Sequence, residues 1–245
     1  MTNVLIIGAT SALAIATARR LAQRTASFHL LGRNEQYLAT VATDLGVRGA
    51  KSAQYAHFDA INFDTHRQII EQAFDDLKMI DVVLISHGSL PDQPRCESDF
   101  PTTLHELSIN GIGTLSLLTH IANHMERQGS GTIAVITSVA GDRGRQSNYV
   151  YGAAKSMVSA YLQGLRNRLY PRGVCVLDVK PGYIDTPMTA EFDKNFLWAK
   201  PDTIARDIIK GIDKKSHTIY TPKVWWLIMA IVKNTPESLF KRLKL

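Results

Sequence analysis

The segment Val4-Leu5-Ile6-Ile7-Gly8-Ala9-Thr10-Ser11-Ala12-Leu13-Ala14 lies near the N-terminus; its apolar run ends at a glycine, and an alanine-rich stretch follows. An apolar run this short, bounded by glycine, predicts a buried strand, and alanine favours helix. A buried strand that turns directly into a helix is typical of a parallel sheet with helices on its faces. The start of the helix would offer unpaired N–H groups to a phosphate.

The rest of the chain repeats this alternation of short apolar runs and longer amphipathic segments. We predict strands at 3–7, 28–32, 52–58, 81–86, 132–138 and 174–179, a seventh near 217–220, and helices at 12–24, 34–45, 63–77, 101–128 and 149–170. The pattern predicts an α/β fold: a single domain over 1–245 with a doubly wound, Rossmann-like, mostly parallel sheet of about seven strands and helices on both faces.

Composition narrows the class of protein. The 245 residues are 45% hydrophobic and 20% charged, which is globular. The net charge of +6 is spread along the chain, which favours a phosphate-bearing ligand or a phospholipid surface and argues against nucleic acid. Cys96 and Cys175 lack the spacing of a metal site or a disulfide framework. We therefore expect no metal site. The apolar run at the N-terminus is too short for a signal-peptide core, and we expect a cytoplasmic location.

The first turn is a candidate phosphate loop with an unusual composition. Dinucleotide fingerprints use three glycines, whereas this turn has Gly8 at the first position and Ala12 and Ala14 at the other two. The turn is therefore either a dinucleotide site or an ordinary strand-to-helix connection. For the first case we predict cofactor contacts from the turn and the start of the helix, at Gly8, Thr10, Ser11 and Leu13.

Further cofactor contacts are expected where the next strands end. Arg33 follows the second strand, where an NAD site would carry an acid, and a guanidinium there favours the 2′-phosphate of NADP(H). It could instead be a solvated residue. Asp59 is placed to accept from an adenine amino group or to cap a helix, and Gly88 allows close approach of a ribose. His87 is expected to be structural.

Tyr151 and Lys155 are four positions apart in a predicted helix, so both side chains rise from one face. An ammonium beside a phenol favours the phenolate, and we expect Lys155 to lower the Tyr151 pKa toward neutrality. The bare pair could be a chance surface feature. It is supported by Ser138, which follows the fifth strand, and by Asn110-Gly111, which interrupts a long helical pattern.

The sixth strand leads into Pro181-Gly182-Tyr183-Ile184-Asp185-Thr186-Pro187-Met188. This turn could hold the nicotinamide end of a cofactor, with contacts from Pro181, Ile184 and Thr186. The following segment, 186–205, is a candidate substrate cap.

Taken together, these motifs resemble the short-chain dehydrogenase/reductase superfamily along the whole chain. The resemblance implies a tetrad of Asn110, Ser138, Tyr151 and Lys155, with Tyr151 and Lys155 also touching the cofactor. It implies hydride transfer between NADP(H) and a ketone or secondary alcohol, in a homodimer or homotetramer formed through the helices at 101–128 and 149–170. The chain departs from the family at Ala12 and Ala14, and by having Ile85-Ser86-His87-Gly88 in place of Asn-Asn-Ala-Gly.

A narrower likeness rests on the block Tyr149–Lys155 and on the C-terminal sequence. Both look like reductases of the decaprenylphosphoryl-2-keto-ribose type, which implies a ketone on an apolar, lipid-linked substrate. The alternatives are a soluble carbonyl or 3-oxoacyl reductase and, from another class, a catalytically silent dinucleotide-binding sensor or scaffold. A sensor has no need of Ser138 and Tyr151 together.

The C-terminal segment 223–245 is apolar and basic. Residues 224–232 are all apolar but would form only about 14 Å of helix, against the ~30 Å core of a bilayer. Glu237 is the only acid beside five basic residues, at Lys223, Lys233, Lys241, Arg242 and Lys244. We expect contact with an anionic membrane surface, or else a subunit interface or a lid over the substrate mouth.

Overall fold

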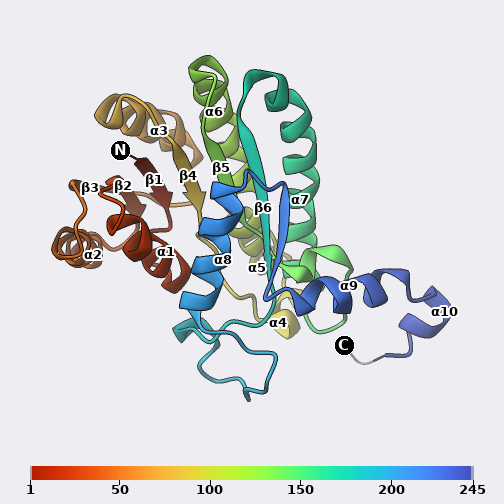
Figure 1. Ribbon diagram of the computed structural model, residues 1–245. Helices are drawn as coiled ribbons and strands as arrows, with labels where there is room; N and C mark the ends of the chain where they lie inside the picture. The colour runs from red at the N-terminus through yellow and green to blue at the C-terminus, as the bar shows by residue number, and fades with distance from the viewer. Residues whose placement is uncertain (1, 244–245) are drawn as a thin grey trace.

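The computed structural model describes residues 2–243, and its centre is a seven-stranded parallel sheet in the order β3-β2-β1-β4-β5-β6-β7 (Figure 1). The strands are β1 (Asn3–Ile7), β2 (Ser27–Gly32), β3 (Ser52–His57), β4 (Val82–Ile85), β5 (Thr132–Ile136), β6 (Cys175–Pro181) and β7 (Thr218–Thr221). All seven predicted strands are found, which confirms the doubly wound fold.

The order of the strands reverses beside β1. This strand pairs with β2 on one side and with β4 on the other, so that Ile6 lies opposite Leu30 and Leu84. The connections that follow β1 and β4 therefore pass to opposite faces of the sheet. In open parallel sheets the crevice at such a reversal, at the carboxyl ends of the strands, is where ligands bind.

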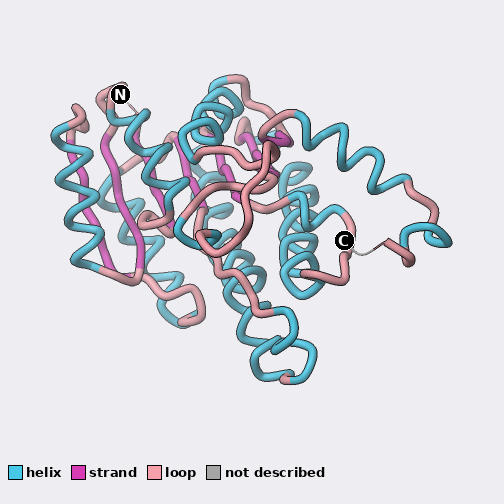
Figure 2. The backbone as a smooth tube through the Cα atoms, turned by 90° about the horizontal axis from the view of Figure 1, so that it is seen from below, coloured by secondary structure: helices cyan, strands magenta, loops and turns pink. Residues whose placement is uncertain are grey.

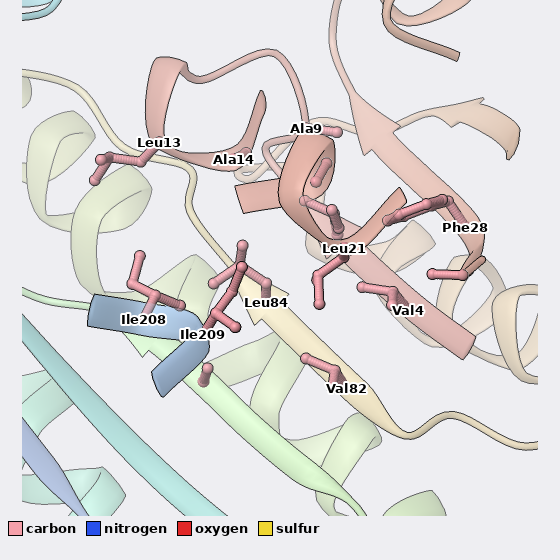
Figure 3. Packing of buried hydrophobic residues seen from close by; sticks show 14 of the residues in the cluster. Val4, Ala9, Leu13, Ala14, Leu21, Phe28, Val82, Leu84, Ile208 and Ile209 are labelled. Atoms are coloured by element: carbon pink, nitrogen blue, oxygen red, sulfur yellow. The ribbon is translucent and has the colours of Figure 1, made fainter. Parts of the chain in front are cut away.

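Three long helices cover each face of the sheet (Figure 1). One face carries α1 (Ala12–Ala22), α2 (Glu35–Val47) and α8 (Pro201–Asp213), and the other carries α3 (Phe63–Leu77), α6 (Gly113–Gln128) and α7 (Tyr149–Leu169). Alternate residues of each strand enter the two cores: Val4 and Ile6 face α1, whereas Leu5 and Ile7 face α3 and α6. Figure 3 shows the first of these cores, where Phe28, Leu84 and Ile208 converge from β2, β4 and α8.

Three helical regions differ from the sequence prediction. The region predicted as one helix over 101–128 is divided into α5 (Phe100–Leu107), a π-helical turn at Ser108–Ile112 and α6, so the predicted break at Asn110-Gly111 is present. The prediction missed α8, and residues 201–205 form the start of this helix, in which Ile204 and Ala205 are buried. Only 186–200 remain free to cover the site, and a capping role for them stays a prediction. A short helix not predicted from the sequence, α4 (Gln93–Ser98), lies before α5.

The C-terminal segment forms α9 (Val224–Asn234) and α10 (Glu237–Phe240), which extend away from the sheet in Figure 1 and Figure 2. One side of α9 is buried, through Trp225 and Met229, while Trp226 and Ile231 are more than 60% exposed. No helix within residues 2–243 is long and apolar enough to cross a membrane. Lys244 lies outside the described residues.

Phe28 tests the packing of the first core. The side chain is fully buried, and Phe28→Ala should lower the free energy of unfolding by about 3–5 kcal/mol because it leaves a cavity among close-packed neighbours. Phe196 is 92% exposed, and the matched control Phe196→Ala should change the free energy of unfolding by less than about 0.5 kcal/mol. Urea denaturation measures both, and equal losses would contradict the assignment of the core.

Candidate active site

A cavity of about 390 Å³ opens where β1, β4, β5 and β6 end. Its walls come from the turns that follow these strands and from the start of α7. Of the predicted site residues, Ser138, Tyr151, Lys155, Thr10, Ser11, Leu13, Gly88, Pro181, Ile184 and Thr186 line it, whereas Gly8, Arg33, Asp59 and Asn110 do not. The strand ends thus bring together side chains from four separate parts of the sequence.

Ser138 and Tyr151 meet because α7 packs closely on the turn that follows β5. Ser138 begins a 3₁₀ turn, Val139–Asp142, and its hydroxyl accepts the N–H of Ala140 at 3.0 Å. The phenol of Tyr151 lies close enough to Ser138 for the serine side chain to lower its pKa, and both residues line the cavity. The close packing needs Gly152, where a Cβ would lie 2.9 Å from the Ala140 carbonyl oxygen.

The expected effect of Lys155 on the Tyr151 pKa was wrong for this structure. Burial raises the pKa of Tyr151 to about 12, and the nearby Ser138 side chain opposes this rise only in part. The Lys155 ammonium lies 5.6 Å from the centre of the Tyr151 ring and does not reverse the effect. The phenol is therefore protonated at neutral pH, which suits a proton donor.

Lys155 is itself held in a buried position on α7. Its amine donates to the carbonyl of Ile136 at 3.3 Å. Burial lowers the Lys155 pKa to about 8, while the carboxylate of Asp178 acts in the opposite direction. At neutral pH the amine keeps its proton but can release it more easily than an exposed lysine.

Asn110 lies behind the cavity wall and organises it. In the π-helical turn, the N–H of Gly113 bonds to the Ser108 carbonyl five residues earlier. The Asn110 amide is fully buried, accepts the N–H of Ser89 at 3.0 Å and donates to the Ser89 hydroxyl at 2.9 Å. At Gly88 a Cβ would lie 2.9 Å from Asn110 Oδ1, so this glycine allows the close contact.

Sequence reasoning missed two polar residues that support this arrangement. Glu106 accepts the hydroxyl of Ser89 at 2.5 Å and also contacts the Asn110 amide at 3.3 Å. Its position one turn before Asn110 was the available signal. Gln93, on α4, accepts the N–H of Val150 at 3.2 Å and so caps the start of α7. Only the tertiary fold brings Gln93 there.

The residues after β1 fit the phosphates of a dinucleotide. Gly8 has a φ of +78°, and a Cβ there would lie 2.5 Å from the backbone nitrogen of His87. The Ser11 hydroxyl accepts the N–H of Ala14 and bonds to the Ser86 hydroxyl at 2.7 Å. The N–H groups of Ala12 and Leu13 have no hydrogen-bond partner within residues 2–243 and lie at the cavity, where an anion could accept from them.

Two predicted contacts lie at the far end of this site. Arg33 is exposed after β2, and no ion pair joins it to another residue of the described chain. Asp59 follows β3, and its side chain accepts the N–H of Ile61 at 3.1 Å. Asn62, not Asp59, is the N-cap of α3. Both remain candidates for the adenosine end.

His87 has a structural environment. Burial lowers its pKa to about 3, so the ring is neutral at physiological pH. Its Nε2 pairs with the hydroxyl of Thr114 at 3.2 Å, and the ring packs edge-on against Phe58. Among residues 2–243, no group of His, Cys, Asp and Glu side chains is arranged to hold a metal ion.

Comparisons of the sequence with known proteins find relatives that match most of its length. A family model described as short chain dehydrogenase matches residues 2–196. An uncharacterized oxidoreductase of Streptomyces coelicolor is 34% identical over 98% of this chain and 95% of its own length, and one of Mycobacterium tuberculosis is 29% identical over 98% and 96%.

Solved structures show the same fold. A short chain dehydrogenase/reductase family protein has a TM-score of 0.79 at 25% identity, covering 89% of this chain and 94% of the other. An actinorhodin polyketide ketoreductase variant, solved with NADPH, has a TM-score of 0.79 at 20% identity, covering 90% and 95%. The match of the family model over most of the length, together with the cavity at the ends of the parallel strands, shows that the chain belongs to the short-chain dehydrogenase/reductase family.

Proposed function

We propose that this protein is an NADP(H)-dependent reductase in which Tyr151 gives a proton to the oxygen of a ketone. The observation that carries the proposal is the placement of Ser138 next to the half-buried Tyr151 phenol, beside Lys155, at a cavity open to a ligand. A raised phenol pKa keeps the proton in place until negative charge develops on the oxygen.

Each residue then has a separate task. When bound, the nicotinamide dinucleotide supplies the hydride. Tyr151 donates the proton, and Ser138 donates a hydrogen bond to the same oxygen and stabilises its developing charge. Lys155 binds near the cofactor ribose and favours the charged form of Tyr151 after the transfer. Asn110 holds Gly88 and Ser89 in position, and its backbone could carry a water that returns a proton through Lys155.

The cavity favours an apolar substrate, and we propose a lipid-linked one. Leu90, Val139, Met188 and Trp198 are apolar residues that line the cavity. Tyr183 stacks on Trp198 with ring centroids 5.3 Å apart, which extends this apolar surface toward the loop 190–200. A soluble carbonyl or 3-oxoacyl reductase would use the same tetrad, and a substrate panel followed by NADPH absorbance distinguishes the two.

Removing the Tyr151 hydroxyl tests the proton donor. Tyr151→Phe should lower kcat by about 100-fold or more, because general acids contribute this much, while the fold and NADPH binding are retained. Stopped-flow or steady-state NADPH oxidation gives the rate, and fluorescence titration gives the cofactor affinity. Tyr170→Phe, at an exposed position far from the cavity, is the control. Near-normal turnover by Tyr151→Phe would exclude this role.

The preference for NADP(H) is assigned to Arg33, which is exposed and unpaired in the described chain at the position that faces the cofactor's ribose in this fold. Arg33→Ala should weaken NADPH binding by about 10- to 100-fold, the usual worth of a charge-assisted phosphate contact, and leave NADH binding nearly unchanged. Isothermal titration with both cofactors measures the ratio. An equal loss for NADH and NADPH would show that Arg33 does not read the 2′-phosphate.

We further propose that the outer side of α9 rests on an anionic membrane surface. Trp226, Leu227 and Ile231 are each more than half exposed there, and the basic residues Lys223 and Lys233 flank them. An apolar helix face bordered by lysines is the pattern of an interfacial helix. Such a contact would place the mouth of the cavity near a lipid-linked substrate.

Vesicle sedimentation tests the membrane contact with the full chain. The wild type should pellet with phosphatidylcholine vesicles that contain phosphatidylserine, and the double variant Trp226→Ser/Ile231→Ser should partition at least about tenfold more weakly, because two large side chains no longer enter the lipid. Tyr170→Ser, which removes a 74%-exposed aromatic elsewhere, should pellet like the wild type. Equal pelleting of all three would end the membrane proposal.

A further inference from the structure

Arg145 is a cation at the active-site cavity without a partner. It lies between the 3₁₀ turn of Ser138 and the first turn of α7, and it lines the cavity beside Tyr151. Its Nε is buried and has no hydrogen-bond partner, and no ion pair joins the guanidinium to any residue between 2 and 243. A buried guanidinium nitrogen without an acceptor costs free energy, so its place at a cavity suggests that a ligand supplies the acceptor.

Other arginines that border a groove of this protein are paired. Beside α1, Arg19 and Arg48 both contact Asp44, and Arg20 contacts Asp202 at 2.6 Å. Arg143, two positions before Arg145, donates to the carbonyls of Val232 and Thr235 and to Glu237. Arg145 differs because no acceptor from the described chain reaches it.

The charge of the cavity is one-sided. Among its lining residues there is no aspartate or glutamate, and the charged side chains are Arg145 and Lys155. The Lys155 amine already donates to the Ile136 carbonyl and lies beside the Tyr151 ring. Two further polar atoms of cavity-lining residues have no partner within residues 2–243: Nδ1 of His87, and Oδ1 of Asn148, which lies on the same loop as Arg145. The loop that carries Arg145 and Asn148 therefore presents an unpaired cation and an unpaired acceptor to the cavity, and no aspartate or glutamate lines that cavity.

We propose that Arg145 binds an anionic oxygen group of the substrate, a phosphoryl or a carboxylate carried on the ketone. The proposal rests on the reductase function proposed above and adds the chemical class of the substrate. A guanidinium forms two parallel hydrogen bonds to either group, which fixes its orientation as well as its charge. Asn148 lies where it can accept from a hydroxyl beside that group.

The anion in question belongs to the substrate and not to the cofactor. Cofactor phosphates are expected at the start of α1, where the N–H groups of Ala12 and Leu13 are free, and at Arg33 after β2. Arg145 instead lies on the segment that joins Ser138 to Tyr151. These are the two residues that hold the reacting oxygen, so Arg145 would hold a group a short distance away on the same molecule.

Matched ketones test the inference with the full-length protein and NADPH. The substrates are 4-acetylphenyl phosphate, 4-acetylbenzoate and the neutral 4-methoxyacetophenone. We expect the wild type to prefer at least one anionic ketone, and Arg145→Met to lower kcat/KM for it by about 10- to 100-fold, mainly through KM, as for loss of a charge-assisted hydrogen bond. The neutral ketone should be unaffected. The phosphate and carboxylate arms show which anion is preferred, and Arg145→Lys should restore part of the preference.

Controls separate this inference from a structural role and from the proposed function itself. Arg127→Met removes one positive charge from the exposed side of α6 and should leave all three kcat/KM values unchanged. Binding of phenyl phosphate and benzoate is measured by calorimetry without any turnover. If no ketone is reduced but Arg145→Met still loses this binding, the anion site stands and the reductase proposal fails. Equal losses for charged and neutral ketones, or equal anion binding by wild type and Arg145→Met, would overturn the inference.

Discussion

Four neighbouring parallel strands, β1, β4, β5 and β6, end at one edge of the sheet, and each is followed by a turn that contributes to the cavity. Because the strands are parallel, the chain must cross back over the sheet before the next strand can end at the same edge. The four turns therefore come from distant parts of the sequence. Their separation is fixed by the hydrogen-bonded ladders. A side chain placed at a strand end thus has little freedom relative to its neighbours, which suits the precise positioning of a ligand.

A buried ion network reinforces this edge beside Ser138. Lys180, near the end of β6, contacts Asp142 at 2.5 Å and Asp178 at 3.7 Å, and the hydroxyl of Tyr220 donates to Asp142 at 2.7 Å. The carboxylates are almost fully buried, and removing charges from water is costly unless the partners are well placed. The network joins the turn after β5 to β6 and β7, so we infer that its role is to hold that turn in one position.

The sequence predicted the sheet well because buried parallel strands are short apolar runs that need no tertiary information. It also predicted ten of the residues that line the cavity, since each follows a strand or lies on the first turns of a helix, but it missed lining residues such as Arg145, Asn148 and Trp198. What it could not supply depends on contacts between distant segments. Periodicity alone did not reveal that the region 101–128 contains a π-helical turn. The pKa of Tyr151 was misjudged because burial outweighs the nearby ammonium, and burial is a property of the packed structure.

The C-terminal part of the chain is also needed to complete the site. The family model ends at residue 196, yet Trp198 lines the cavity and Trp225 packs over the turn after β6. A Cβ at Gly182 would lie 1.9 Å from the Trp225 indole nitrogen, so only a glycine leaves room for α9 to pack against this turn. Arg143 holds the other end of α9 to the turn that begins at Ser138. Because α9 touches the turns after both β5 and β6, it joins the C-terminal part of the chain to two walls of the cavity.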